Sequence, residues 1–175
     1  MAKKLSTKNL VITALLIAFG ILIPIAFWFL RVTLPPAFTA TLTAHVPIFI
    51  AMFISPSSAI FTTIGTTIGF LVAGLDLVVV IRAASHIFFA IAGTYMFRKN
   101  CNIILTGVVT AVLHALFEAL VVYAFLAFGW MTSGETFVKV AFYTTGIGTL
   151  IHHAIDYIIA IAIIKGLSKA NINLK

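Results

Sequence analysis

Residues 77–97 read LVVVIRAASHIFFAIAGTYMF, an apolar run in which Arg82 and His86 are the only side chains that commonly carry charge. An α-helix rises about 1.5 Å per residue, so a run of this length crosses the roughly 30 Å hydrocarbon core of a bilayer. The run therefore predicts a transmembrane helix. Its arginine and histidine each need a partner or a function inside the membrane.

Five further apolar runs surround this segment. They predict helices at residues 9–30, 45–54, 59–73, 103–128 and 137–166. The second run is short, and a Ser-Pro turn joins it to the third as a hairpin. After the first run, Arg31 and the Pro35-Pro36 pair predict a stiff extended loop, because proline stops a helix. We expect an all-α integral membrane bundle of six transmembrane helices, forming one domain over residues 1–175.

The composition requires an apolar environment. Hydrophobic residues make up 62% of the chain and charged residues 9%, whereas soluble domains have about 45–50% and 25%. The net charge is +7, but the basic residues lie in short segments between apolar runs and form no continuous polar face. Nucleic acid binding is therefore not expected. Cys101 is the single cysteine, which excludes a disulfide within the chain.

Helix packing is indicated by small residues. Gly65 and Gly69 in the third run have the Gly-x-x-x-Gly spacing, and Ala14 and Ala18 in the first run have the analogous alanine spacing. Small residues at this spacing let helices approach closely in lipid. We expect the glycines to pack against a neighbouring helix, and the alanines to pack against a helix of this chain or of another subunit.

The distribution of basic residues predicts the orientation. With six spans and a cytoplasmic N-terminus, the inner segments hold eight basic residues and the outer segments hold two, Arg31 and Lys139. The inner set is Lys3, Lys4, Lys8, Arg98, Lys99, Lys165, Lys169 and Lys175. Cytoplasmic loops carry an excess of Lys and Arg, so both termini are expected in the cytoplasm.

Ionisable side chains inside the predicted helices mark a candidate site. Pairs at i and i+4 share one helix face, and two such pairs occur, Arg82 with His86 and His114 with Glu118. The sixth run adds His152, His153 and Asp156. Their depths along the helices place these groups near the middle and in the outer half of the bundle, so we expect them to converge on a polar pocket open to the outside.

Two interpretations of Arg82 stay open at this point. The arginine and Glu118 neutralise each other as an internal ion pair, or the planar guanidinium binds the carboxylate of an anionic ligand. The histidines and Asp156 of the sixth run likewise form either a structural pair or part of a binding site.

Enzyme and metal signatures are missing from the sequence. No His-Glu-x-x-His or Gly-x-Ser-x-Gly pattern occurs, and no Gly-x-x-x-x-Gly-Lys motif for ATP is present. We expect no catalytic activity, no bound metal and no cofactor. The chain alone is not expected to drive transport with ATP.

Three segments resemble the S components of energy-coupling factor (ECF) transporters. These segments are the Ala14-x-x-x-Ala18 stripe, residues 45–56 (HVPIFIAMFISP) and residues 148–156 (GTLIHHAID). The resemblance implies a small six-helix subunit that binds one vitamin and docks on a transmembrane coupling subunit with two ATPases. It further implies that the alanine stripe contacts the coupling subunit, and that the ligand lies in the outer half of the bundle.

Within this family, the sequence most resembles the members that bind niacin or related pyridine vitamins. In that interpretation Arg82 binds the carboxylate of nicotinate, and Trp130, Phe38 or Tyr143 stacks on its ring. Riboflavin, pyridoxine and a pyrimidine are the alternative substrates. The expected substrate-binding residues are Arg82, His86, His114, Glu118, Trp130, Tyr143 and His153.

A carrier driven by ions is the alternative function. Asp156 with His152 and His153 then relays protons. Dependence on partner ATPases separates the two functions. In either case the protein is expected in the plasma membrane of a prokaryote.

Overall fold

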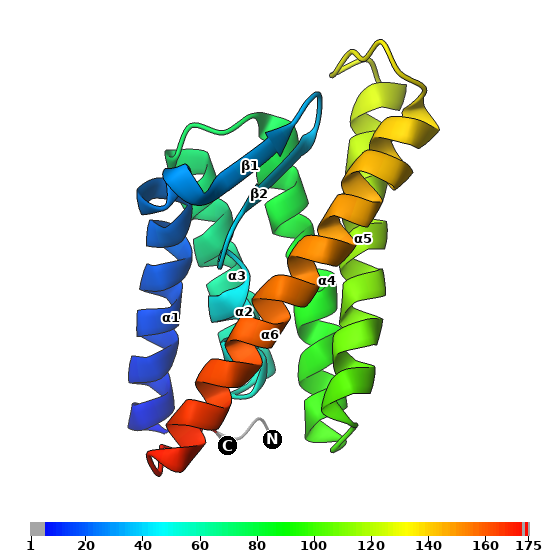
Figure 1. Cartoon of the computed structure of the whole chain (residues 1–175). Helices are drawn as coiled ribbons and strands as arrows, with labels where there is room; N and C mark the ends of the chain where they lie inside the picture. Colours follow the sequence, from blue (N-terminus) through cyan, green and yellow to red (C-terminus); the bar gives the residue numbers. More distant parts are fainter. Residues whose placement is uncertain (1–5, 173, 175) are drawn as a thin grey trace.

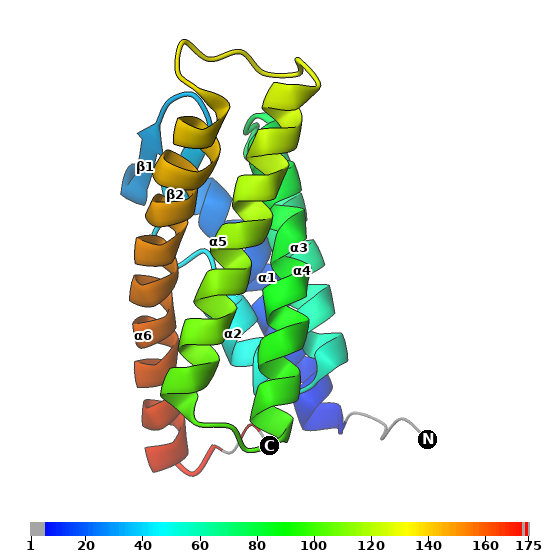
Figure 2. The same ribbon diagram turned by 90° about the vertical axis from the view of Figure 1, so that its right-hand side faces the viewer.

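The computed structural model describes residues 6–172 and 174. Its α-helices are α1 (Thr7–Ala26), α2 (Val46–Met52), α3 (Pro56–Val72), α4 (Leu77–Arg98), α5 (Ile103–Ala127) and α6 (Gly148–Lys169). A π-helical stretch, η2 (Lys139–Ile147), leads directly into α6. The longer helices run side by side, and α6 crosses the others obliquely (Figures 1 and 2). All six helices predicted from the sequence are therefore present as one bundle.

Four helical segments of the described chain are long and apolar enough to cross a bilayer. They are Thr7–Ala26, Leu77–Arg98, Ile103–Ala127 and the continuous Lys139–Lys169. The apolar helix α3 is shorter, with 17 residues, and α2 has 7 residues that are all buried. At about 1.5 Å per residue, α2 does not cross a bilayer by itself. Its place is inside the bundle.

The segment after α1 differs from the prediction. The first helix ends at Ala26 instead of Leu30, and a 3-10 turn, η1 (Trp28–Leu30), follows it. Strands β1 (Arg31–Leu34) and β2 (Phe38–Thr41) then pair antiparallel, with Leu34 opposite Phe38. Prolines 35 and 36, joined by a cis peptide bond, form the turn. Because extended β-branched residues pair readily across such a turn, the predicted loop becomes a β-hairpin that covers one end of the bundle (Figure 1).

Glycines bring α1 and α3 into close contact. A Cβ atom on Gly69 would lie 2.6 Å from the Ile21 carbonyl oxygen, and one on Gly65 would lie 2.9 Å from Cγ2 of Ile17. No side chain fits at these distances. The Gly-x-x-x-Gly stretch is therefore a helix-packing surface, as its spacing predicts.

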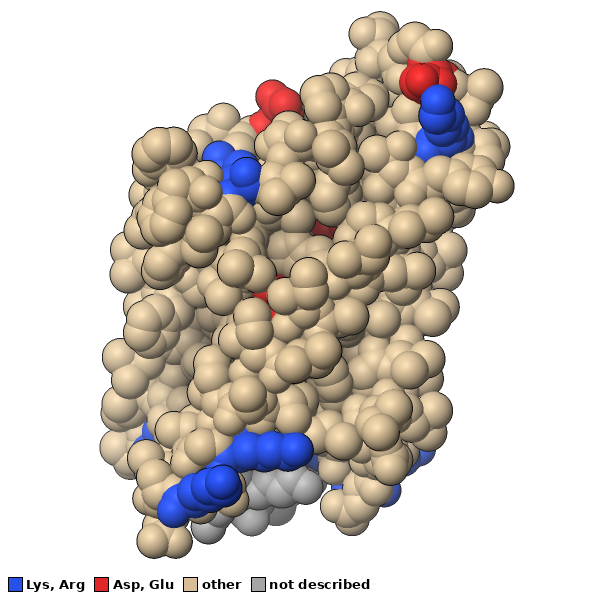
Figure 3. Space-filling model, in the orientation of Figure 1, with Lys and Arg blue, Asp and Glu red and all other residues tan. Residues whose placement is uncertain are grey.

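The two ends of the bundle differ in charge. The start of α1 and the end of α6 lie at the same end (Figure 1), where blue basic side chains gather in Figure 3. The basic residues at the helix termini there are Lys8, Arg98, Lys99, Lys165 and Lys169. Lys3, Lys4 and Lys175, which belong to the same predicted inner set, lie outside the described residues. The hairpin end carries residues of both signs, Arg31, Asp76, Glu135 and Lys139.

Candidate substrate-binding site

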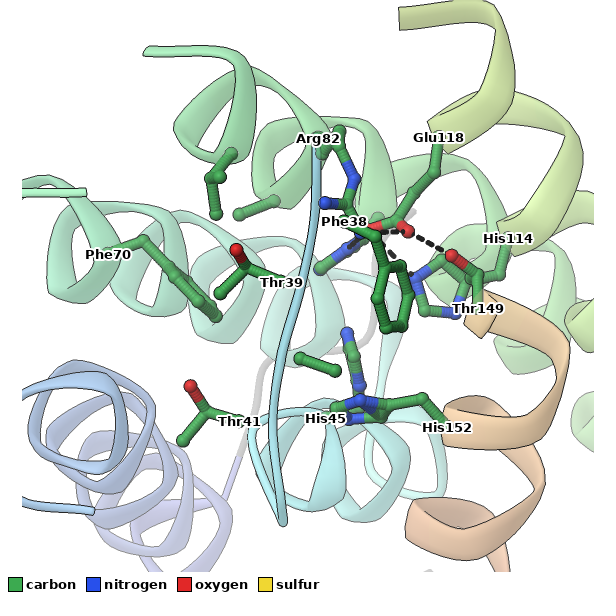
Figure 4. Close-up of a pocket in the computed structure, with 14 residues that line it drawn as sticks. Phe38, Thr39, Thr41, His45, Phe70, Arg82, His114, Glu118, Thr149 and His152 are labelled. Carbon is green, nitrogen blue, oxygen red and sulfur yellow. Dashed lines mark hydrogen bonds and ion pairs between the residues drawn. The ribbon is translucent and has the colours of Figure 1, made fainter. Parts of the chain in front are cut away.

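A small cavity with both polar and apolar lining residues lies toward the hairpin end of the bundle. Its wall is formed by strand β2, by His45 just before α2, and by residues of helices α3, α4, α5 and α6. The cavity volume is about 20 Å³, which is room for about one water molecule. Figure 4 shows Phe38 of β2 in front of the polar side chains, so the hairpin forms the outer wall.

Glu118 is the centre of the polar network beside this cavity. Its Oε2 accepts hydrogen bonds from Arg82 Nη2, at 2.7 Å, and from the Thr149 hydroxyl. Its Oε1 lies 2.9 Å from His86 Nε2. Arg82 and Glu118 are 3% and 4% exposed, and a charge in such surroundings needs a close opposite charge. The i, i+4 pairs of α4 and α5 thus face each other, and Glu118 points at Arg82 (Figure 4).

Arg82 is held by more than its ion pair. Its Nη1 donates a 2.7 Å hydrogen bond to the carbonyl of Ala37, and the ring of Phe38 lies 5.5 Å from its Cζ. Its Nε is buried and has no hydrogen-bond partner. The guanidinium therefore links the hairpin to α4 and α5, while its Nε has no acceptor.

Asp156 organises a second network below the first. Its carboxylate accepts hydrogen bonds from the backbone nitrogens of Thr43, at 2.8 Å, and His45, at 3.0 Å. It also contacts the His45 ring at Nδ1 and the His152 ring at Nε2, at 3.1 and 2.9 Å. Asp156 therefore fixes the segment between β2 and α2 against α6.

The structure brings five of the seven predicted site residues together. Arg82, His86, His114 and Glu118 line the cavity. His153 lies behind them, with its Nδ1 3.0 Å from His114 Nδ1 and its Nε2 3.2 Å from Thr110 Oγ1.

The two predicted aromatic residues lie elsewhere. Trp130 is 69% exposed and packs edge-on against Phe125, and Tyr143 is 63% exposed. Neither lines the cavity, whereas Phe38, the third aromatic candidate, does.

Most lining residues were outside the predicted set, and His45 and Thr149 are two of them whose side chains contact a buried carboxylate. His45 precedes α2 and Thr149 is the second residue of α6, and both are buried. The signal for His45 was present, because it is a histidine next to an apolar run. Thr149 resembles the many threonines that only satisfy a helix carbonyl, so its type and position gave no signal.

One curated protein resembles this chain along nearly its whole length. It is the niacin transporter NiaX of Lactococcus lactis subsp. cremoris (strain MG1363), with 34% identity over 96% of this chain and 78% of the relative. The chain belongs to the family of niacin-type S components. Members of this family are vitamin transporters, so the predictions of a membrane transport protein and of no enzyme activity are confirmed. No family model and no solved structure matches the chain.

Within this niacin-type family, the cavity is the natural candidate for vitamin binding. It is the place where ionisable residues from α4, α5 and α6 meet inside an apolar bundle. Such groups in a membrane are expensive to bury and usually serve a function.

Proposed function

We propose that this chain is the niacin-binding S component of an ECF-type importer in the plasma membrane of a prokaryote. It crosses the membrane several times, with both termini in the cytoplasm. The observation that carries the proposal is the buried Arg82 cluster beside a cavity, in a chain homologous to a niacin transporter. Niacin is a small aromatic monocarboxylate, and an arginine suits its carboxylate.

Arg82 is the proposed carboxylate-binding residue. Its free Nε is a donor that is buried without an acceptor, and such a group is costly until it is paired. His86, His114 and Glu118 form the adjacent polar wall, and His153 supports His114 from behind. Phe38 is the aromatic residue in position to contact the ring of the vitamin.

Binding of niacin requires the cavity to widen. Small-molecule pockets have volumes of about 300–1,000 Å³, whereas this cavity has about 20 Å³. The two-stranded hairpin is the part of the wall that does not belong to a helix, and Arg82 holds it through the Ala37 carbonyl and the Phe38 ring. We therefore place the required movement at β2 and Phe38.

Docking to the coupling subunit is proposed for the alanine stripe on α1. Ala14 and Ala18 are exposed, whereas Thr13, Leu16 and Gly20 of the same helix are buried. The stripe therefore faces away from the bundle, where a helix of another subunit has access. This geometry supports contact of the stripe with another subunit, because the opposite face of α1 is the one that packs within the chain.

The orientation follows from the charges. The end of the bundle with Lys8, Arg98, Lys99, Lys165 and Lys169 is proposed to face the cytoplasm. The hairpin end, with the cavity below it, then faces outside, as an importer requires.

Two measurements test the proposal. Calorimetric titration of the detergent-solubilised chain should show tight binding of nicotinate and weaker binding of nicotinamide, which lacks the charge. Uptake of labelled nicotinate by cells should require the partner ATPases. Uptake that persists without them would favour the ion-coupled carrier, and absence of binding would contradict the assignment of niacin.

A further inference from the structure

Three histidines from separate helical elements converge beside the cavity. His45 precedes α2, His86 is on α4 and His114 is on α5. Each pair of their ring centroids is 4.6 Å apart. One ring nitrogen from each histidine lies within 4.8 Å of those of the other two, so the three rings form a compact triangle.

The hydrogen-bond partners fix the tautomers of His45 and His86. A carboxylate only accepts hydrogen bonds, so the ring nitrogen that faces it carries the hydrogen. His45 presents Nδ1 to Asp156, and His86 presents Nε2 to Glu118. The opposite nitrogens, Nε2 of His45 and Nδ1 of His86, are therefore unprotonated acceptors.

The tautomer of His114 follows from a longer chain of contacts. The Thr110 hydroxyl donates to the Thr106 carbonyl at 2.7 Å, so it accepts from His153 Nε2. His153 Nδ1 then accepts from His114 Nδ1, which leaves His114 Nε2 as an unprotonated acceptor. That nitrogen lies 3.4 Å from Glu118 Oε1, which is also an acceptor, and makes no hydrogen bond.

All three free nitrogens are buried without a hydrogen-bond partner. The three residues are 5%, 2% and 2% exposed. Unprotonated ring nitrogens of three histidines packed this closely, next to the Glu118 carboxylate, are unfavourable unless a cation or hydrogen-bond donors satisfy them. We propose that His45, His86 and His114 bind a divalent transition-metal ion, with Zn²⁺ as the first candidate, and that niacin binds to the open position of this ion. This inference rests on the proposed function and deepens it.

The coordination chemistry fits such an ion. Three histidines with a fourth open position are a known Zn²⁺ arrangement, with Zn–N distances of about 2.0–2.1 Å. Metal-binding histidines usually donate their other ring hydrogen to a carboxylate or a similar acceptor, as His45 and His86 do here. A second group, His45 with His152 and Asp156, is also close enough for a metal. The ring nitrogens of His45 and His152 that face Asp156 already hydrogen-bond to its carboxylate. These atoms are therefore not free to bind an ion, and the first group is the better candidate.

The open position faces the cavity. On one side Phe89 packs against all three rings, with centroid distances of 6.2, 5.6 and 4.6 Å. Phe89 is fully buried and has no ligand atom. All three histidines line the cavity, and Phe89 does not. A fourth ligand therefore reaches the ion from the cavity.

Charge balance gives the ion a role in selecting the substrate. Among residues 6–172 and 174, the buried charged side chains are one cation, Arg82, and two anions, Glu118 and Asp156. With neutral histidines the described bundle interior carries a net charge of −1, which repels a carboxylate. A divalent ion changes this charge to +1, and a monocarboxylate such as nicotinate then brings it to zero. Net charge inside a membrane is costly, so the ion favours an anionic vitamin.

Niacin has groups for both unsatisfied features of the site. Its pyridine nitrogen supplies a lone pair for the ion, and its carboxylate accepts from the free Nε of Arg82. Both features lie next to Glu118, which contacts Arg82 through Oε2 and His86 through Oε1. Benzoate keeps the carboxylate but lacks the ring nitrogen, and therefore isolates the contribution of the metal.

The experiment uses the full chain, stripped of metal with a chelator. Titration with Zn²⁺ alone should show one ion per chain, and Co²⁺ should give the intense visible absorption of a tetrahedral site. Adding nicotinate should shift that absorption, and benzoate should leave it unchanged. Nicotinate affinity should fall at least tenfold in the stripped protein and return when Zn²⁺ is restored.

Single substitutions distinguish the histidines proposed to bind the ion from the neighbouring histidine. His86→Gln and His114→Gln should each weaken Zn²⁺ binding by more than a hundredfold, because even loss of a supporting partner costs about 10- to 100-fold. His152→Gln removes a partner of Asp156 but no ligand of the ion, so it should weaken Zn²⁺ binding by at most about 10- to 100-fold. Loss of Zn²⁺ in His152→Gln alone, with retention in the other two, would move the site to the Asp156 group and overturn the assignment. Monodispersity in size-exclusion chromatography confirms folding of each variant, and the chelation experiment on the unaltered chain needs no variant.

The outcomes separate the site from the proposed function. Failure of the stripped protein to bind Zn²⁺ or Co²⁺ would overturn the inference and indicate that water satisfies the three nitrogens. Equal nicotinate affinity with and without the ion would overturn its role in substrate binding and leave the niacin assignment intact. The chain could instead bind one metal ion but fail to bind nicotinate in both the stripped and the Zn²⁺-loaded protein. That result would contradict both the assignment of niacin and the role of the ion in substrate binding.

Discussion

Arg82 of α4 and Glu118 of α5 form an ion pair at 2.7 Å that is almost completely buried. Of the two interpretations left open by the sequence, the structure therefore contains the internal pair. The pair still leaves Nε of Arg82 without a partner beside the cavity. The same guanidinium can thus neutralise Glu118 and receive a carboxylate, and the two roles are separable by mutation.

Substitution of Arg82 should discriminate between nicotinate and nicotinamide. A hydrogen bond to a charged group contributes about 1.5–3 kcal/mol, and 1.4 kcal/mol is about tenfold in affinity. Arg82→Ala should weaken nicotinate binding by roughly a hundredfold and nicotinamide binding much less. Arg82→Lys should retain only part of the nicotinate affinity, because a lysine ammonium cannot form the two parallel hydrogen bonds that a planar guanidinium makes to a carboxylate. Calorimetry with both ligands measures this, and equal losses would remove the arginine from carboxylate binding.

The ion pair predicts a specific pattern of protein stability. Arg82→Met and Glu118→Leu should each leave one uncompensated buried charge and cost about 3–5 kcal/mol, whereas the double variant should recover most of the loss. Thermal unfolding in detergent measures the three variants against the unaltered protein. Additive destabilisation in the double variant would show that the two residues do not depend on each other.

Asp156 should contribute to stability through the backbone it holds. Asp156→Ala leaves the half-buried amide of Thr43 and the buried amide of His45 without their acceptor, at about 1–3 kcal/mol for a buried group. The matched control is Asp76→Ala, since Asp76 is exposed and makes no side-chain cap hydrogen bond to α4. Thermal unfolding should show a clear loss for the first variant and little change for the second. Equal stability of both variants would contradict the anchoring role.

The α1–α3 interface should not tolerate a side chain at Gly69. Gly69→Ala places a Cβ against the Ile21 carbonyl oxygen, so the helices must separate and the protein should lose stability. Gly166→Ala is the control within α6, because no atom of the described residues lies within 4 Å of its Cβ position. There alanine should stabilise the helix by about 0.5–1 kcal/mol. Opposite shifts in the melting temperature of the two variants would agree with the described packing, and a neutral Gly69→Ala would not.

The alanine stripe should affect coupling and leave vitamin binding unchanged. Ala14→Leu or Ala18→Leu should abolish nicotinate uptake in cells that contain the partner subunits, because the larger side chain holds the partner helix away. Nicotinate affinity of the isolated chain should stay the same, since no residue of α1 lines the cavity. Ala84→Leu, at an exposed alanine on α4, is the control. Normal uptake by both stripe variants at normal expression would exclude the docking role.

Several features followed from the sequence alone. Apolar runs of spanning length can only be buried in lipid or in one another, so residues 77–97 and 103–128 predicted α4 and α5 almost to their ends. The i, i+4 spacing placed Arg82 with His86, and His114 with Glu118, on single helix faces. These are local properties, set by the helical repeat and by the cost of exposing the backbone to hydrocarbon.

Only the tertiary structure decided which of those faces meet. The contact between Arg82 and Glu118 depends on how α4 packs against α5, and the place of His45 depends on Asp156, 111 residues away, fixing the chain before α2. The hairpin likewise formed where the sequence indicated only an extended loop, because strand pairing is a contact between segments. Sequence spacing reports neighbours along one helix, whereas the triangle of His45, His86 and His114 comes from three elements. No periodicity within a single segment contains that information.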